Sequence, residues 1–249
     1  ARGSGSAEFG SVMIWGPPGV GKSEVCAEVA KERQVRLIDF RLTLMDPTEL
    51  KGYGWPDVKE GITRWLPPEQ LPRGEERAIL FFDDLTTAPP LVQAAAYQLT
   101  LKPHRLGEYQ LPEESIIIAA GNRVQDRSVA HKMPAALANR FTTHIDYDIS
   151  LDDWLQWAVK SNIRAEVTAF NKTWYGREAG PSITKDSKKQ ESEHWPLFAF
   201  DPLRNDRSFP TPRSWAAVSR ILDEGFSQQV ERLLVSGAIG DGTAHEFYA

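Results

Sequence analysis

The chain has 249 residues, 41% hydrophobic and 25% charged, which suits a globular protein with one large α/β domain or a core domain plus a small one. The net charge of −5 argues against a general nucleic-acid binder, which normally carries a basic excess. No apolar run approaches the roughly 20 residues of a membrane-spanning helix. With Cys26 as its one cysteine the chain cannot form an internal disulfide, and we expect a reducing compartment, the cytoplasm.

The first elements in chain order alternate between strand and helix patterns. Residues 1–11 are rich in Gly and Ser, have no hydrophobic signal core, and are expected to be a linker or cloning remnant. The chain's own sequence would then begin almost directly at a short buried strand, 12–15. Helical spacing over 21–33 and an apolar run at 35–40 predict a helix and a second strand. Residues 46–65 are rich in Gly, Pro and Trp and are expected to be an irregular insertion.

Three further strands are predicted, at 78–82, 115–120 and 142–148. Helices are predicted between them, one opened by Pro89 and Pro90 and a short one at 134–139. Strands that alternate with helices in this way imply a parallel sheet covered on both faces.

No strand pattern follows residue 150. Residues 151–175 and the chain from 211 onward have helical patterns, whereas 177–194 has few aliphatic residues and is expected to be an exposed loop. The predicted organisation is therefore an α/β core over 12–149 and an α-helical lid domain over 150–249.

The motif GPPGVGKS fits the pattern G-x-x-x-x-G-K-[ST] between a strand and a helix. Glycines let backbone N–H groups converge on phosphates, and the helix N-terminus adds its dipole. We expect ATP as the ligand, with Lys22 at its β- and γ-phosphates and the Ser23 hydroxyl on Mg²⁺. A chance Gly-rich turn is the alternative, which the flanking strand and helix disfavour. The predicted nucleotide-binding residues are Gly16, Pro17, Pro18, Gly19, Val20, Gly21, Lys22, Ser23 and Glu24.

Two carboxylates follow the apolar strand 78–82. Asp83 ends it, and because ligands of parallel sheets bind at the carboxyl ends of the strands, we expect Asp83 to supply a second Mg²⁺ contact. Asp84 comes next, where a general base would orient the attacking water. The alternative is that both residues cap the turn before the helix at Pro89.

Three polar residues further along the chain suit a phosphate site. Asn122 follows the strand 115–120 after one glycine and could hold water near the γ-phosphate, or serve as a turn residue. Arg140 and Arg213 are either solvated surface or guanidinium forks for a phosphate site assembled between subunits.

Together these segments resemble the AAA+ ATPases, and within them the MoxR-like branch, over nearly the whole chain after the N-terminal linker. GPPGVGKS (16–23) is similar to Walker A and ILFFDD (79–84) to Walker B. AAGNR (119–123) is similar to the sensor-1 segment, which implies that Asn122 is the sensor. The fold implied is the P-loop NTPase sheet of the AAA+ core, followed by a helical lid.

Two arginines take their implied roles from the same resemblance. LANRF (137–141) resembles the arginine-finger segment, which implies that Arg140 reaches a neighbour's nucleotide. TPRSW (211–215) is similar to the sensor-2 segment, which implies that Arg213 reaches the γ-phosphate of its own subunit.

The chain departs from the family pattern at Walker B, where Asp-Glu is usual and Asp83 is followed by Asp84. The missing methylene withdraws the base by roughly one C–C bond, a misplacement that can lower a rate by about 10²-fold. Arg123 and Arg127 lie in the loop after sensor 1, and either could act in trans in place of Arg140.

Two hairpin-like insertions favour the MoxR-like branch. Residues 46–52, followed by GITRWLPP (61–68), resemble its helix-2 insertion, and RLGEYQLP (105–112) resembles the hairpin placed before sensor 1. Residues 88–99 resemble the helix after Walker B. The resemblance implies a hexameric ring and a partner with a von Willebrand factor A domain.

Three functions remain open. The leading one is an ATP-driven, chaperone-like ring that remodels a protein partner. The second is a nucleotide-gated assembly scaffold with slow hydrolysis, which the short Asp84 motivates. The third is a DNA-directed motor, against which the acidic balance counts, since the basic cluster of Lys51, Lys59 and Arg64 is small.

Overall fold

The computed structural model describes residues 10–100, 103–123, 133, 135–148, 150–177, 197–200 and 206–249. Within these residues the chain forms two compact units, one made of 10–16 and 22–147, the other of 17–21 and 148–249. Among the described helices, none is both long and apolar enough to cross a membrane.

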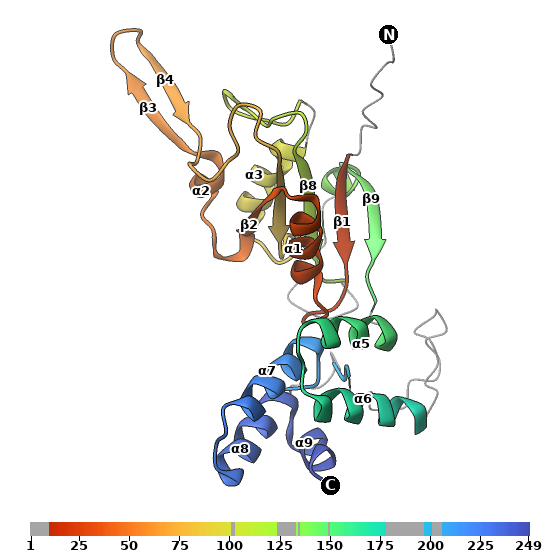
Figure 1. The fold of residues 1–249 in the computed structure, drawn as a ribbon. Coiled ribbons are helices and arrows are strands. Elements are labelled where there is room, and N and C mark those ends of the chain that lie inside the picture. Colours follow the sequence, from red (N-terminus) through yellow and green to blue (C-terminus); the bar gives the residue numbers. More distant parts are fainter. Residues whose placement is uncertain are drawn as a thin grey trace, which may run out of the picture. The chain divides into compact units, whose positions relative to one another are not determined.

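A five-stranded parallel sheet forms the centre of the first unit (Figure 1). Its strands, in spatial order, are β2 (Arg36–Arg41), β5 (Ala78–Asp83), β8 (Ile116–Gly121), β1 (Ser11–Trp15) and β9 (Phe141–Asp146). The carboxyl ends of β1 and β8 lie side by side, since Trp15 pairs with Gly121. Phe82 of β5 pairs with Ala119 of β8, so the residues that follow β1, β5 and β8 all emerge at one edge of the sheet.

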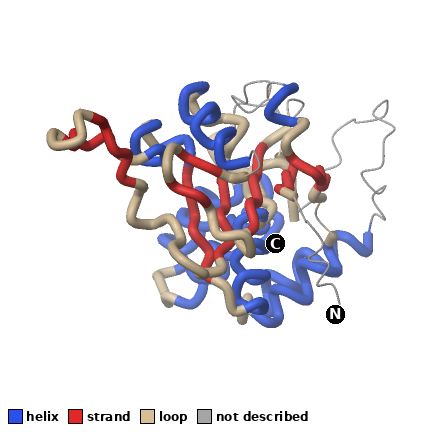
Figure 2. The backbone as a smooth tube through the Cα atoms, turned by 90° about the horizontal axis from the view of Figure 1, so that it is seen from above, coloured by secondary structure: helices blue, strands red, loops and turns tan. Residues whose placement is uncertain are grey.

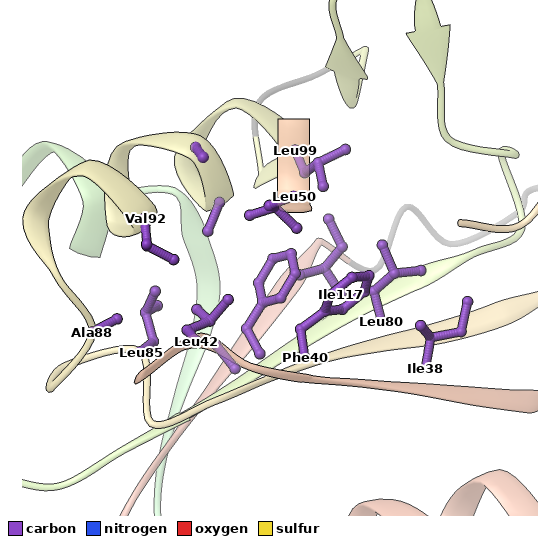
Figure 3. Close-up of a cluster of buried hydrophobic side chains, with 14 of the residues drawn as sticks. Ile38, Phe40, Leu42, Leu50, Leu80, Leu85, Ala88, Val92, Leu99 and Ile117 are labelled. Atoms are coloured by element: carbon purple, nitrogen blue, oxygen red, sulfur yellow. The ribbon is translucent and has the colours of Figure 1, made fainter. Parts of the chain in front are cut away.

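Helices cover both faces of this sheet, as the sequence predicts (Figure 1). Helix α1 (Lys22–Arg33) places Cys26 against a small cluster that includes Ile14 and Phe81. Helix α3 (Pro90–Thr100) packs on the opposite face of the sheet, in a cluster that includes Met13. Met13 and Ile14 are successive residues of β1, so their side chains point to opposite faces. Figure 3 shows this larger cluster, in which buried side chains of α3 meet those of the sheet.

The insertion at 46–65 is ordered, and the expectation of an irregular segment is wrong there. After a short 3-10 turn (Leu42–Leu44), helix α2 (Pro47–Lys51) begins with a capping box between Asp46 and Glu49. Strands β3 (Tyr53–Asp57) and β4 (Ile62–Leu66) then form an antiparallel hairpin that projects away from the five-stranded sheet (Figure 2).

Two small elements complete the first unit. Strands β6 (Arg105–Leu106) and β7 (Tyr109–Gln110) form a second, very short hairpin. The short helix expected at 134–139 is α4 (Ala135–Ala138), while residue 134 lies outside the described residues.

The regular elements described after residue 150 are all helices, in agreement with the predicted fold class. They are α5 (Leu151–Lys160), α6 (Ala165–Arg177), α7 (Pro212–Asp223), α8 (Gln228–Ile239) and α9 (Asp241–Phe247). The Trp215 side chain is fully buried among them, with ring centroids 5.5 Å from Phe170 and 5.7 Å from Phe247. The loop expected at 177–194 lies outside the described residues after Arg177.

One helical stretch was expected over 151–175, and the structure divides it. Asn162 takes a positive φ of 54°, and the Ile163 N–H donates to the Ala158 carbonyl oxygen at 2.9 Å. An Asn in the left-handed region just after a helix is a common way to satisfy its last carbonyl groups. Helix α5 therefore ends at Lys160, and α6 begins separately at Ala165.

Candidate functional site

Lys22 lies at the sheet edge where β1 and β8 end. It is the first residue of α1 and is 7% exposed. Its Nζ donates to the Gly16 carbonyl oxygen at 2.8 Å and to Asn122 Oδ1 at 3.3 Å. The loop before it turns through glycines with positive φ, 79° at Gly19 and 99° at Gly21. The ammonium group is thus held where polar groups from two strand ends meet.

Ser23 and Asp83 place a hydroxyl and a carboxylate together beside Lys22. Ser23 Oγ donates to Asp83 Oδ2 at 3.0 Å, and Asp83 Oδ1 accepts the Asp84 N–H at 3.0 Å. Oxygen ligands of this kind suit Mg²⁺, which binds through one or two protein groups and completes its shell with water and phosphate. The described residues contain no group of three His, Cys, Asp or Glu able to hold a metal ion. Ser23 and Asp83 could thus supply two oxygen ligands to a Mg²⁺ ion.

Asp84 has an unusual backbone conformation. Its φ is 54°, and its carbonyl oxygen accepts the N–H groups of Thr87 at 3.0 Å and Ala88 at 3.1 Å. Asp is among the few non-glycine residues that tolerate positive φ. The Asp84 backbone thus starts the turn into α3, which is the turn role considered from the sequence.

Thr86 is a site residue that the sequence analysis missed. Its Oγ1 accepts the Asn122 N–H at 3.1 Å and donates to the Asn122 carbonyl oxygen at 3.4 Å. Both residues are buried, and a Cβ built on the neighbouring Gly121 would lie 2.6 Å from Thr86 Cγ2. The Thr86 side chain therefore fixes the backbone that carries Asn122, and Gly121 provides the space for it.

The arginines lie at different places. Arg140 follows α4, and its guanidinium donates to the Tyr97 phenol oxygen from Nε at 3.1 Å and from Nη2 at 2.9 Å. Arg123 Nε lies 3.2 Å from Asp146 Oδ1, at the end of β9. Arg127 lies outside the described residues.

Arg213 belongs to the second unit, together with the loop residues 17–21. Its backbone N–H donates to the Gly19 carbonyl oxygen at 3.4 Å, and its side chain is exposed. A Cβ built on Gly19 would lie 3.0 Å from Thr211 Oγ1, so the loop backbone comes close to the start of α7. A side chain at position 19 would be strained for this reason as well as for its φ.

The structure brings together four of the predicted residues. They are Lys22, Ser23, Asp83 and Asn122. Of the other predicted loop residues, Gly16 and Val20 are buried, Pro17, Pro18, Gly19 and Gly21 are half-buried, and Glu24 is exposed on α1. Arg140 is held at Tyr97, and Arg213 is in the other unit.

The environment of the Cys26 thiol changes its pKa. Burial, and then the carboxylates of Asp83 and Asp39, raise the pKa of the Cys26 thiol to about 12. A thiol with such a pKa is protonated and unreactive at neutral pH. Cys26 is therefore a packing residue of α1 and no part of the site chemistry.

Comparisons with known proteins agree with this fold. Residues 11–141, which hold four of the five strands of the sheet and the four clustered residues, match the family described as AAA domain (dynein-related subfamily). No curated protein matches the chain.

Two solved structures are similar to the chain at low sequence identity. A presumed ATPase of Cytophaga hutchinsonii is 18% identical with a TM-score of 0.46, over 65% of this chain and 48% of that one. The Thermotoga maritima RuvB Holliday junction branch migration motor is 14% identical with a TM-score of 0.48, over 96% of this chain and 60% of that one. The chain thus spans about half to three fifths of the length of these proteins.

Proposed function

The chain belongs to the AAA domain family, dynein-related subfamily, and from this membership we propose that it binds and hydrolyses ATP with Mg²⁺. We further propose that it acts as a ring-forming, MoxR-like remodeller of a protein partner. The family supports the nucleotide chemistry, while the branch, the ring and the partner rest on sequence motifs.

One observation carries the proposal. The Lys22 ammonium donates hydrogen bonds to the Gly16 carbonyl oxygen and the Asn122 amide oxygen. The next residue, Ser23, is hydrogen-bonded to Asp83. A cation, a polar amide and two oxygen ligands thus gather at the carboxyl edge of a parallel sheet, where phosphate ligands bind. Such a group of side chains serves phosphoryl transfer, in which catalysis is mostly positioning and charge stabilisation.

Each residue has a role in this proposal. Lys22 would leave its present carbonyl and amide partners for the β- and γ-phosphate oxygens, and Asn122 would orient the attacking water. Ser23 and Asp83 would hold Mg²⁺, which when bound neutralises charge on the phosphates. Asp84 would accept the proton of that water. Arg213 would reach the γ-phosphate from its own subunit.

The remaining part of the site would come from a neighbour. Arg140 is exposed, and a planar guanidinium supplied in trans suits the charge that develops on the γ-phosphate. We propose a hexameric ring in the cytoplasm, with a von Willebrand factor A domain protein as partner. These proposals rest on the segments 46–68, 105–112 and 137–141, which resemble those of the MoxR-like branch.

The first prediction concerns nucleotide binding by Lys22. Lys22→Ala removes the cation that the loop places at the phosphates, so ATP binding measured by calorimetry with Mg²⁺ should be lost. Lys31→Ala, on the exposed side of the same helix, is the matched control and should bind ATP normally. Melting temperatures of both variants show whether each is folded. Tight ATP binding by folded Lys22→Ala protein would contradict the phosphate assignment.

A nucleotide-gated scaffold with slow hydrolysis is the second candidate. The short Asp84, at a backbone position with positive φ, favours it. Steady-state ATP turnover with and without the partner distinguishes the two functions. A remodeller should turn over ATP faster with its partner, whereas a scaffold should assemble on ATP and hydrolyse it slowly in both cases.

A further inference from the structure

The Arg140 guanidinium is bound along one edge by a single phenol oxygen. Tyr97 Oη accepts both the Nε and the Nη2 hydrogen bonds, and Arg140 Cζ lies 5.2 Å from the centre of the Tyr97 ring. A guanidinium has five N–H donors in a planar fork, and Tyr97 takes two of them from one edge. The opposite edge, which includes Nη1, keeps its donors for another acceptor.

Tyr97 and Arg140 come from different elements. Tyr97 is on α3, partly buried against the large core cluster, and Arg140 follows the short α4. Without Tyr97, an exposed arginine would sample many rotamers and would lose that freedom on meeting a phosphate. A side chain held beforehand by a rigid helix avoids this loss.

We propose that Tyr97 is a positioning residue that holds Arg140 in the orientation in which it reaches the nucleotide of a neighbouring subunit. The proposal rests on the proposed trans role of Arg140. It adds that the arginine used at one site is held by the helix that follows Walker B of its own subunit. The helix is reached through the turn at Asp84, whose carbonyl oxygen accepts the Ala88 N–H.

The test is Tyr97→Phe, which removes the phenol oxygen and keeps the ring. Misplacement of a catalytic group by about 1 Å can lower a rate by about 10²-fold, so we expect kcat to fall by about 10-fold or more. ATP affinity and melting temperature should stay close to those of the wild type. A role limited to packing would move the melting temperature without this selective loss of kcat.

Two further variants isolate the effect. Tyr109→Phe is the matched control, since the Tyr109 phenol donates to the Pro72 carbonyl oxygen and not to an arginine. It should keep wild-type kcat. In an Arg140→Ala background, Tyr97→Phe should produce no additional loss, because the side chain it positions is already absent.

A mixing experiment tests whether Tyr97 acts on the neighbour's site. Subunits with Tyr97→Phe keep an intact phosphate site, and subunits with Lys22→Ala keep an intact Arg140. In an equal mixture about a quarter of the head-to-tail interfaces would combine the two intact halves, so turnover should rise above that of either variant alone.

The outcomes are distinguishable. No recovery in the mixture would place the effect of Tyr97 in its own subunit and would overturn the proposal. Wild-type turnover by Tyr97→Phe beside a collapsed Arg140→Ala variant would also overturn it, as would faster turnover, which would mean that Tyr97 restrains Arg140. Normal turnover by Arg140→Ala would instead contradict the proposed trans role itself.

Discussion

Backbone and side chain place different demands on residue 84. Its positive φ of 54° favours Asn, Asp or Gly, whereas a general base with the usual reach would be Glu. The Asp found here satisfies the backbone and shortens the reach. This conflict gives a physical reason for the departure from the Asp-Glu pattern, and it makes the two conservative substitutions informative.

The substitutions at Asp84 should act in opposite directions on turnover. Asp84→Asn tolerates the same backbone conformation and removes the base, so kcat should fall by about 10²-fold or more, the usual contribution of general base catalysis, while ATP stays bound. Asp84→Glu should raise kcat because it restores the longer reach of the base. Glu tolerates positive φ less well than Asp, so this variant should be less stable by about 1 kcal/mol. Steady-state kinetics and thermal melts measure both effects. Equal turnover by all three proteins would leave Asp84 as a turn residue only.

The position of Asn122 at the end of a strand could be predicted from the sequence. The hydrogen bonds with Thr86 that hold its backbone could not. Thr86 is far from Asn122 in the sequence, and one hydroxyl in a turn gives no signal that it will bind both backbone groups of another strand end. The same holds for Tyr97 and Arg140, which only tertiary packing brings together. Sequence patterns thus placed Asn122 at a strand end but gave no signal for the tertiary contacts that support Asn122 and Arg140.

At the scale of elements, the apolar runs predicted all five strands of the parallel sheet within a residue or two. Composition alone predicted an irregular segment at 46–65, because most side chains of the β3–β4 hairpin are exposed and Trp55 and Trp65 do not produce an alternating apolar pattern. The family resemblance did indicate a hairpin-like insertion there. The end of α5 was missed although Asn162 was a usable signal, since Asn often follows a helix.

The buried Cys26 allows the packing of helix α1 to be measured by thiol labelling. Because burial and nearby carboxylates raise its thiol pKa to about 12, the thiolate fraction stays small in the native state until the pH approaches that value. A thiol reagent at pH 8 should therefore label the native protein far more slowly than the denatured protein. Labelling at equal rates in both states would show that α1 does not pack as described.

The rate of Cys26 labelling should also respond to ATP binding. ATP with Mg²⁺ binds only the native state in the proposed function, so a saturating concentration should slow labelling further by stabilising that state. Lys22→Ala is the control, because its labelling rate should not respond to ATP.

At the scale of the molecule, each compact unit has its own hydrophobic core. The first is built on the sheet with α1 and α3, and the second surrounds Trp215. The loop residues 17–21 group with the second unit, whereas Lys22 and Ser23 begin the first helix of the other.

In the proposed function, the site hydrolyses ATP only when a neighbouring subunit supplies Arg140. An arginine supplied in trans can contribute about 10³-fold or more to turnover. Arg140→Ala should therefore keep its melting temperature and its ATP binding while its turnover collapses, because the side chain is exposed within the single chain.

The most direct measurement is ATP turnover by an equal mixture of Arg140→Ala and Lys22→Ala subunits, each nearly inactive alone. The first keeps its phosphate site and the second its arginine, so about a quarter of the interfaces in the mixture would be complete. We predict turnover well above that of either variant by itself. A mixture that assembles but stays as inactive as its parts, or an Arg140→Ala protein that hydrolyses ATP at the wild-type rate, would contradict the claim.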